Sequence, residues 1–294
     1  MFAASKSGKP AAAGAVTDPN FNSTTLLLET TGTNGQQNNT FLDSSTNNFT
    51  ITRTGTPTQG TFTPFSQTGW GGFFNGTTDY LTAPTNAAFA FGTGDFTIEG
   101  WIYSGANAAS SRMLGNLDSG GWGANRWVIA TNNGSNKLFF QVNNFGSNIL
   151  TSTTTFNTST WVYFAIVRNA STWTLYVNGV SEATATSSVA LDAGTTNLFN
   201  VGASGPTDPF FAGYLSNLRV VKGTAVYTAN FTPSTTPLTA ISGTSLLTLQ
   251  DNYFKDNSSN NFAITATGTP SIQAFSPFAP AAAYSTATVG EWVL

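Results

Sequence analysis

The sequence predicts an all-β protein: an antiparallel two-sheet jelly-roll sandwich bracketed by two copies of a short β module. Three observations lead to this fold class. Phe (24 residues) and Gly (29 residues) are abundant while only 8% of residues are charged, a composition typical of strands and turns. Short apolar runs recur through the central part, each closed by Gly, Asn, Asp or Pro. One segment is repeated near both ends of the chain.

The central strands are expected at Phe73–Phe74, Tyr80–Leu81, Phe96–Tyr103, Arg126–Ala130, Lys137–Val142, Trp161–Arg168, Trp173–Val177 and Leu215–Val221. Many short strands separated by turns are typical of two packed antiparallel sheets. The strand that begins at Trp161 is apolar on both faces, so we expect it to be central and covered on both sides. Asn178-Gly179 predicts a two-residue hairpin turn. No stretch has sustained helical periodicity, so helices should be few.

The repeated segment predicts how the chain is divided. Phe41–Phe65 and Phe254–Phe278 align without a gap and are identical at 15 of 25 positions, and a leucine-rich strand precedes each copy. Their separation is far too long for a solenoid, whose repeats run about 20 to 50 residues. We therefore expect the copies to bracket a central domain. The expected parts are a flexible N-terminal arm (1–24), the first module (25–67), the sandwich (68–240), the second module (241–280) and a C-terminal tail (281–294).

The composition excludes several classes of protein. With 10 Lys and Arg against 13 Asp and Glu, the chain has no basic face for a phosphate backbone, so nucleic acid is not an expected partner. The absence of His and Cys removes Ser-His-Asp and Cys-His catalysis and thiolate or imidazole metal sites. No run approaches the about 20 apolar residues of a membrane helix. The first residues lack the apolar core of a secretory signal, so we expect neither membrane contact nor an export signal.

Four segments in order resemble the laminin-G-like, concanavalin A-like lectin/glucanase superfamily. They are residues 73–81 (FFNGTTDYL), 94–102 (GDFTIEGWI), 161–179 (from WVYFAIVR to TLYVNG) and 211–220 (FAGYLSNLRV). The resemblance covers roughly residues 70 to 222 and implies the sandwich fold. It does not imply one activity, because this fold hosts lectins, adhesion modules, glycosidases and spacers. Where many relatives have a His after the Trp of the Trp161 strand, this chain has Val162 and Tyr163.

The segments outside the sandwich are similar to those of laminin-G-like structural proteins of marine tailed bacteriophages. The similarity rests on residues 222–233 (KGTAVYTANFTP) and on both copies of the module. It implies a virion protein that is assembled in the host cytoplasm, in agreement with the missing signal peptide. The partners it implies are other virion subunits or further copies of the same chain.

Carboxylate chemistry is the one catalytic possibility that the composition leaves. A glycosidase needs two carboxyl groups flanking the scissile bond. The acidic residues closest in sequence are Asp95 with Glu99 and Asp251 with Asp256. We expect Asp95 at a strand entry and Glu99 on a solvated strand position, and Asp256 shares its place in the module with Asp43, which indicates a turn role in both copies. The sequence therefore predicts a protein that is not an enzyme.

A structural calcium ion is the one metal considered, and no other cofactor is expected. By analogy with related sandwiches, Asp79 and Asn217 would supply oxygen ligands. The alternative for Asp79 is a hydrogen-bonding role in the turn that it closes.

A carbohydrate site is the candidate for ligand binding. It requires an exposed aromatic ring beside amide or guanidinium donors. Trp122 and Trp70 lie in Gly-rich loops, and Asn125 and Arg126 follow Trp122 closely. The alternative is that these large aromatic residues belong to the core or to an interface.

The C-terminus ends in an apolar tip, Trp292, Val293 and Leu294, which is expected to anchor the chain in a neighbouring subunit. The sequence thus favours a non-enzymatic structural virion protein, either a capsid decoration or a tail or fibre component. Its sandwich would face outward while its terminal arms dock. The alternative is a carbohydrate-binding adhesin that recognises host-surface glycans.

Overall fold

A computed structural model describes residues 21–29, 41–52, 54, 69–104, 111–117, 123–131, 135–143, 148–156, 159–191, 197–207, 209–273 and 275–278. The chain divides into two compact units, Met1–Ser66 and Gln67–Leu294, which are described separately below. The two helices of the described part are single 3₁₀ turns, η1 (Phe21–Ser23) and η2 (Ala87–Phe89). Neither of them, nor any other described segment, forms a helix long and apolar enough to cross a membrane.

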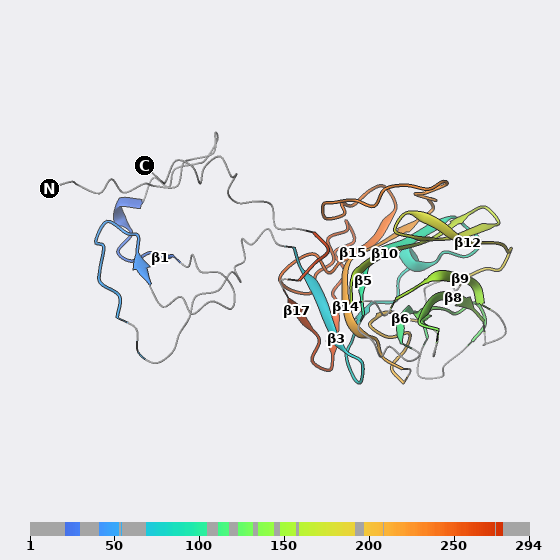
Figure 1. Ribbon diagram of the computed structural model, residues 1–294, viewed down its shortest axis with the longest axis horizontal. Coiled ribbons are helices and arrows are strands. Elements are labelled where there is room, and N and C mark those ends of the chain that lie inside the picture. The colour runs from blue at the N-terminus through green and yellow to red at the C-terminus, as the bar shows by residue number, and fades with distance from the viewer. Residues whose placement is uncertain are drawn as a thin grey trace. The chain divides into compact units, whose positions relative to one another are not determined.

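The larger unit contains two antiparallel sheets that pack face to face (Figure 1). One sheet has the order β12 (Val180–Thr186), β11 (Thr172–Val177), β10 (Trp161–Asn169), β5 (Phe96–Tyr103), β14 (Ala212–Lys222), β3 (Gly71–Asn75) and β17 (Ser271–Gln273), with β15 (Thr244–Thr248) also paired to β14. The other has the order β16 (Thr265–Thr267), β4 (Tyr80–Ala83), β13 (Phe199–Val201), β6 (Arg112–Gly115), β7 (Trp127–Thr131), β8 (Lys137–Val142) and β9 (Asn148–Thr155). The predicted jelly-roll sandwich is confirmed.

Aromatic rings fill the space between the sheets. Phe96 on β5, Trp173 on β11 and Phe140 on β8 are fully buried, and the Trp173 ring lies 5.4 Å from each of the other two ring centroids. Strand β10 lies between β5 and β11 and is buried from Val162 to Arg168, as its apolar sequence predicted. Because several aromatic residues contribute from both sheets, side-chain packing holds the sheets in their relative position.

The turn predicted at Asn178-Gly179 joins β11 to β12. Both residues have positive φ, 48° and 80°, which a two-residue hairpin turn matching the strand twist requires. The strands β6, β9 and β13 were not predicted. Strand β9 (NILTSTTT) is mostly polar and β13 has three residues, so neither carries the apolar alternation on which a sequence-based assignment depends.

The second module is built into the sandwich. Its strand β15 pairs with β14, β16 extends the second sheet beside β4, and β17 extends the first sheet beside β3. In Figure 1, β15 runs beside β14 at the upper part of the sheet and β17 lies beside β3. The module therefore closes the same edge of both sheets.

The smaller unit contains the first module. Its described strands are β1 (Leu28–Glu29) and β2 (Leu42–Asp43), which form a two-stranded antiparallel pair. The buried carboxylate of Asp43 accepts hydrogen bonds from the backbone N–H groups of Leu27, Ser45 and Phe49. Burial acts to raise the pKa of Asp43, but these hydrogen bonds outweigh it and hold the pKa well below its ordinary value. A charged Asp43 therefore organises the loop.

Candidate functional site

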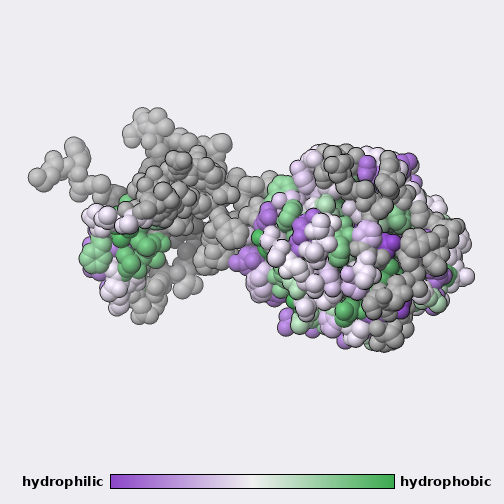
Figure 2. Space-filling model, turned by 90° about the horizontal axis from the view of Figure 1, so that it is seen from below, coloured by the Kyte–Doolittle hydropathy of each residue, from purple (hydrophilic) through white to green (hydrophobic). Residues whose placement is uncertain are grey.

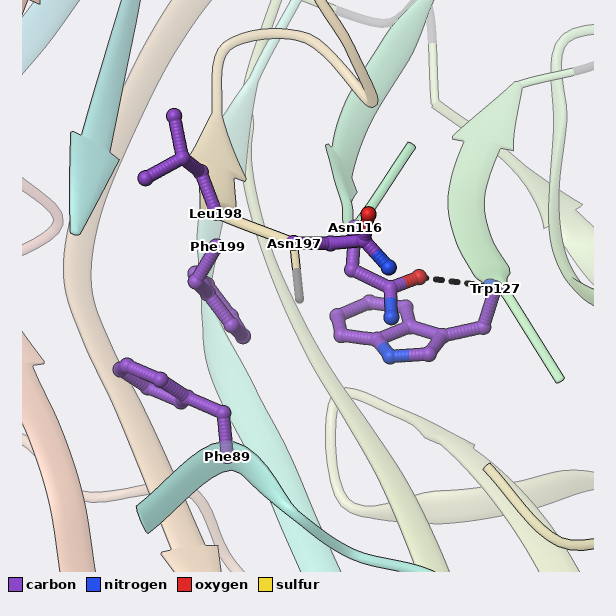
Figure 3. Close-up of a pocket in the computed structure, with 6 residues that line it drawn as sticks. All are labelled: Phe89, Asn116, Trp127, Asn197, Leu198 and Phe199. Carbon is purple, nitrogen blue, oxygen red and sulfur yellow. Dashed lines mark hydrogen bonds between the residues drawn. The ribbon is translucent and has the colours of Figure 1, made fainter. Parts of the chain in front are cut away.

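A small pocket opens at the end of the second sheet where four chain segments meet (Figure 3). It is lined by Phe89, Asn116, Trp127, Asn197, Leu198 and Phe199. Phe89 comes from η2, Asn116 follows β6, and Trp127 begins β7. Asn197 and Leu198 lead into β13, whose first residue is Phe199. Figure 3 shows the two asparagine side chains together beside the Trp127 indole, with the Phe89 and Phe199 rings on the other side.

Hydrogen bonds hold the segments around this pocket in place. The Asn116 side-chain oxygen accepts from the Trp127 N–H at 2.8 Å. The buried Asn200 side chain donates to the backbone oxygens of Leu117 and Ser204, at 3.2 and 3.1 Å. The Phe89 and Phe199 rings stack with centroids 4.8 Å apart. The pocket thus has a rigid apolar wall with amide groups at its side, but its free space of about 10 Å³ holds no more than about one water molecule. Of its lining side chains only Leu198 is exposed, so a sugar ring could contact its rim but could not enter it.

Two predicted carbohydrate-binding residues lie on the turn that leads into this pocket. Asn125 and Arg126 directly precede Trp127, and both are half-buried. Asn125 has a φ of 65°, and its N–H donates to the Asn143 side-chain oxygen at 2.5 Å, so the turn is fixed. Trp122 lies outside the described residues. The sequence did not reveal Asn116, because an asparagine after a short unpredicted strand carries no distinguishing signal.

Trp70 does not form the exposed aromatic platform that the sequence suggested. Its side chain is only 6% exposed, and its backbone oxygen accepts a hydrogen bond from the buried Ser216 hydroxyl at 2.7 Å. The residue precedes β3, which is buried at this end, so the Gly-rich loop brings the ring inward. The alternative assignment of this tryptophan to the core therefore describes it better.

The structure does not bring the two expected calcium ligands together. Asp79 accepts from the backbone N–H groups of Asn75 and Thr269, at 3.1 and 2.8 Å, and thus closes the turn between β3 and β4. Asn75 pairs with Ala212, and Asn217 lies five residues further along β14, which places it on the order of 15 Å away. Calcium needs its oxygen ligands within about 2.6 Å. Asp79 and Asn217 therefore do not form one calcium site.

Asn217 has a structural role at a bulge. The register of β14 against β5 shifts between Ser216 and Arg219, and Asn217 there has a positive φ of 53°. Its side-chain oxygen accepts from the Leu238 N–H at 2.9 Å and from the Gln250 amide at 2.5 Å. The residue thus ties the bulge to the chain that follows β14. Within the described part of the chain, no three acidic side chains gather as a metal site would require.

Glu99 is fully buried, so its expected position on a solvated face is wrong. It lies on the outer face of the first sheet, where the Arg219 guanidinium contacts it at 2.6 Å. Its other oxygen accepts hydrogen bonds from the hydroxyls of Tyr163 and Tyr227. Burial and then the charge of Glu99 raise the pKa of Tyr227 to about 12, and the same two causes raise the pKa of Tyr163.

Protein side chains enclose the Glu99 carboxylate. Tyr227 and Phe231, whose rings stack, belong to the segment after β14 and pack over the sheet face that carries Tyr163. Arg219 also donates to the Thr239 backbone oxygen at 2.8 Å. The Glu99 carboxylate is ion-paired with Arg219 and fully buried, so solvent does not reach it.

The remaining carboxylates with described side chains are also bound within the protein. Asp95 accepts from the Ala170 N–H at 2.7 Å, and Asp251 accepts from the Asn257 amide at 2.8 Å. Glu182 accepts from the N–H groups of Thr153 and Thr154, and these bonds lower its pKa although burial acts to raise it. The expected assembly residues, Trp292, Val293 and Leu294, lie outside the described residues.

Comparisons with known proteins agree with the observed sandwich. The family model described as the concanavalin A-like lectin/glucanases superfamily matches residues 75–226, just over half of the chain. A candidate carbohydrate-binding protein from Bacteroides ovatus is similar in structure, with a TM-score of 0.50 and 17% identity over 81% of this chain and 68% of that one.

A domain of an extracellular arabinanase from Geobacillus stearothermophilus, solved with arabinotriose, has a TM-score of 0.42 and 16% identity over 52% of this chain and 71% of that one. No curated protein matches the chain in sequence. Identities this low concern the fold. Because the family model spans the strands from β4 to β14, the chain belongs to the concanavalin A-like lectin/glucanases superfamily.

Proposed function

We propose that this protein is a non-enzymatic structural protein, a component of a bacteriophage particle that presents its sandwich outward and docks through its terminal parts. The observation that carries the proposal is the surface of the first module. Leu26 is 50% exposed and Phe49 is 57% exposed, and Figure 2 includes a hydrophobic area on the described part of this unit. A small unit that exposes several large apolar side chains is expected to be covered by a partner.

The carboxylates support the absence of catalysis. Each of the seven whose side chains are described accepts hydrogen bonds from the protein itself: Asp43, Asp79, Asp95, Glu99, Glu182, Asp251 and Asp256. A glycosidase needs one carboxyl group free to donate a proton and a second facing the same bond. We expect no turnover of β-glucan by the wild-type chain. Turnover that is abolished by Glu99→Gln would contradict the proposal.

Incorporation into the particle tests the structural role. We expect the full chain to be present in fixed copy number in purified particles, and a chain lacking residues 285–294 to be lost from them. Quantitative mass spectrometry of the particles measures both. A particle that assembles without the chain, or that takes up both forms equally, would contradict the docking role.

Carbohydrate binding is the second candidate function. The likeness to a carbohydrate-binding protein of the same fold supports it, and the half-buried Asn125 and Arg126 on the turn before Trp127 would supply polar contacts at the surface. Leu198 lines the pocket beside Trp127 and is exposed at its rim, so a charge at that position would block a ligand without disturbing the core.

A glycan array with matched variants tests this candidate. Leu198→Asp is expected to lower binding at least tenfold, while Val180→Asp, an equally exposed position on β12, leaves it unchanged. Trp122→Ala extends the test to the loop before the Asn125 turn. No glycan signal for the wild-type chain, or equal signals for all variants, would leave the structural role as the only function proposed.

A further inference from the structure

The two copies of the module share one hydrogen-bond network. In the second copy, Asp256 accepts from the N–H groups of Leu247, Ser258 and Phe262, at 3.1, 2.8 and 2.9 Å. In the first copy, Asp43 accepts from those of Leu27, Ser45 and Phe49, at 3.0, 2.9 and 2.9 Å. The asparagine side chains repeat too: Asn260 donates to the Ser245 oxygen, and Asn47 donates to the Thr25 oxygen. The copies are therefore the same local structure.

The same network covers the same side of the leucine-rich strand. In the second copy, the N–H of Leu247 points to Asp256 and its C=O accepts from Asn257. In the first copy, the N–H of Leu27 points to Asp43 and its C=O accepts from Ser44. Because backbone groups alternate along a strand, the neighbouring residues direct theirs to the opposite edge in both copies.

That opposite edge is paired in one copy and not in the other. Leu246 and Thr248 pair with Val220 and Leu218 of β14. Among the described residues, no strand pairs with the matching edge of the first copy, since β1 pairs only with β2. An unpaired strand edge is a template for a further strand.

Side-chain burial differs in the same way. Leu246 and Leu247 are 0% and 2% exposed, whereas Leu26 and Leu27 are 50% and 36% exposed. Phe262 packs on Phe89 of the sandwich with ring centroids 5.5 Å apart, whereas its counterpart Phe49 is mostly exposed. The first module thus presents the apolar surface with which the second module binds a sandwich.

We infer that the first module binds the open sheet edge of a concanavalin A-like sandwich in another polypeptide, by the pairing that β15 makes with β14. This inference rests on the proposed structural function and names the class of partner. The Leu26–Leu28 segment would add to the partner's sheet as a strand, and Phe49 would pack on its rim. The partner is therefore a sandwich of this fold that lacks its own closing strand.

The partner of the first module is not a second copy of this chain whose own β15 is in place. The matching edge of β14 is already occupied by β15. The first copy also has Leu28 and Glu29 where the second has Thr248 and Leu249, so its strand is adapted to a different neighbour. A closed sandwich takes one module, whereas each chain carries two, which leaves the first module for another chain.

An exchange chimera tests whether the first module fits a sandwich edge. In the otherwise complete chain, residues 244–262 are replaced by residues 24–49. We expect a cooperative thermal transition with a Tm within about 5 °C of the wild type. The matched control is the chimera with Leu26→Asp, whose Tm should fall by more than about 10 °C. A chimera with Glu29→Leu, which restores the leucine of the second copy, is measured beside them. If the chimera fails to fold both with and without this change, the inference is overturned.

A binding experiment tests the docking between chains. The full chain with Leu246→Asp, which places a charge where β15 is buried, offers an opened edge of β14. We expect a one-to-one complex of this variant with the wild-type chain in native mass spectrometry, and none with a Leu26→Asp chain. A variant that keeps its near-ultraviolet circular dichroism but binds neither chain overturns the inference, and if the variant unfolds, the exchange chimera decides.

Two further outcomes keep this inference distinct from the proposed function. If wild-type chains dimerise through Leu26 without any opened edge, the occupant is a second copy and the inference is wrong. If the chimera and the binding experiment both fail while removal of residues 285–294 still prevents particle incorporation, the structural function stands and only the partner class is wrong.

Discussion

The two modules have the same local structure in two different environments. Asp43 and Asp256 organise their loops with matching hydrogen bonds, and the loops follow leucine-rich strands of the same kind. Only the second strand is buried between its loop and β14. Hydrogen bonding within a short module therefore fixes its local geometry, whereas the surface against which it packs decides how much apolar area it buries.

The largest expected difference concerns the leucines at matched positions. Leu246→Ala should lower the free energy of unfolding of the larger unit by about 2 to 5 kcal/mol, because it leaves a cavity at a fully buried position. Leu26 is half exposed, so Leu26→Ala should change the free energy of unfolding of the larger unit by less than about 0.5 kcal/mol. Urea unfolding followed by tryptophan fluorescence measures both. Equal effects would show that the first leucine is buried as well.

Replacing Asp256 and Asp43, whose carboxylates organise the two loops, should give a smaller difference in the stability of the larger unit. Asp256→Ala leaves buried N–H groups of Leu247 and Phe262 without an acceptor and should destabilise the larger unit by about 1 to 3 kcal/mol. Asp43→Ala should leave the unfolding of the larger unit unchanged while the first module loses its loop structure. Calorimetry reports the larger unit, and the amide signals of Ser45 and Phe49 report the module. A shift of the larger unit's Tm by Asp43→Ala would argue against independent modules.

Replacing the phenylalanine at the centre of each module should give a still smaller difference in stability. Phe262→Ala removes the ring contact with Phe89 and should cost about 1 kcal/mol or somewhat more, given partial burial. Phe49→Ala should be neutral for the larger unit and should weaken any complex that the first module forms. Both variants can be measured in one urea series. Similar losses for the two would remove the distinction between a packed and an unpacked module.

Acid should act on the first module through Asp43. Because its pKa is lowered in the folded state, the ionised carboxylate stabilises the loop fully above the ordinary aspartate pKa of about 4. This stabilisation is lost as the pH falls below that value toward the lower folded pKa. Amide hydrogen exchange at Leu27, Ser45 and Phe49 should therefore speed up, relative to the intrinsic rate, between pH 5 and pH 2. The same profile in Asp43→Ala, which has no carboxylate to titrate, would contradict this cause.

Local pattern was sufficient to predict much of the fold. The bounds of β5 and β8 and the Asn178-Gly179 turn follow from apolar alternation and turn residues that lie close together in sequence. The family was expected from a resemblance carried by four segments in order. The turn role of Asp43 and Asp256 followed from the repeat itself. These features depend on short-range geometry, which a single sequence contains.

The site could not be predicted to the same extent, because it depends on distant contacts. Glu99 is buried by Arg219, 120 residues away, and by Tyr227 on a segment that folds over the sheet. Asn116 and Leu198 meet in one pocket although they come from separate loops. Asp79 and Asn217 looked like paired ligands by analogy, but the strand register separates them. No periodicity or spacing within a segment reports such long-range pairings.

Hydrogen exchange on the isolated full chain tests the central contrast most directly. We predict that the Leu246 and Thr248 amides, which face β14, exchange only with unfolding of the larger unit. The Leu26 and Leu28 amides, at the unpaired edge of the first module, should exchange orders of magnitude faster and become protected when a partner sandwich is bound. Slow exchange of Leu26 and Leu28 in the isolated chain, matching that of Leu246 and Thr248, would show that the edge of the first module is already paired and would contradict the proposed docking.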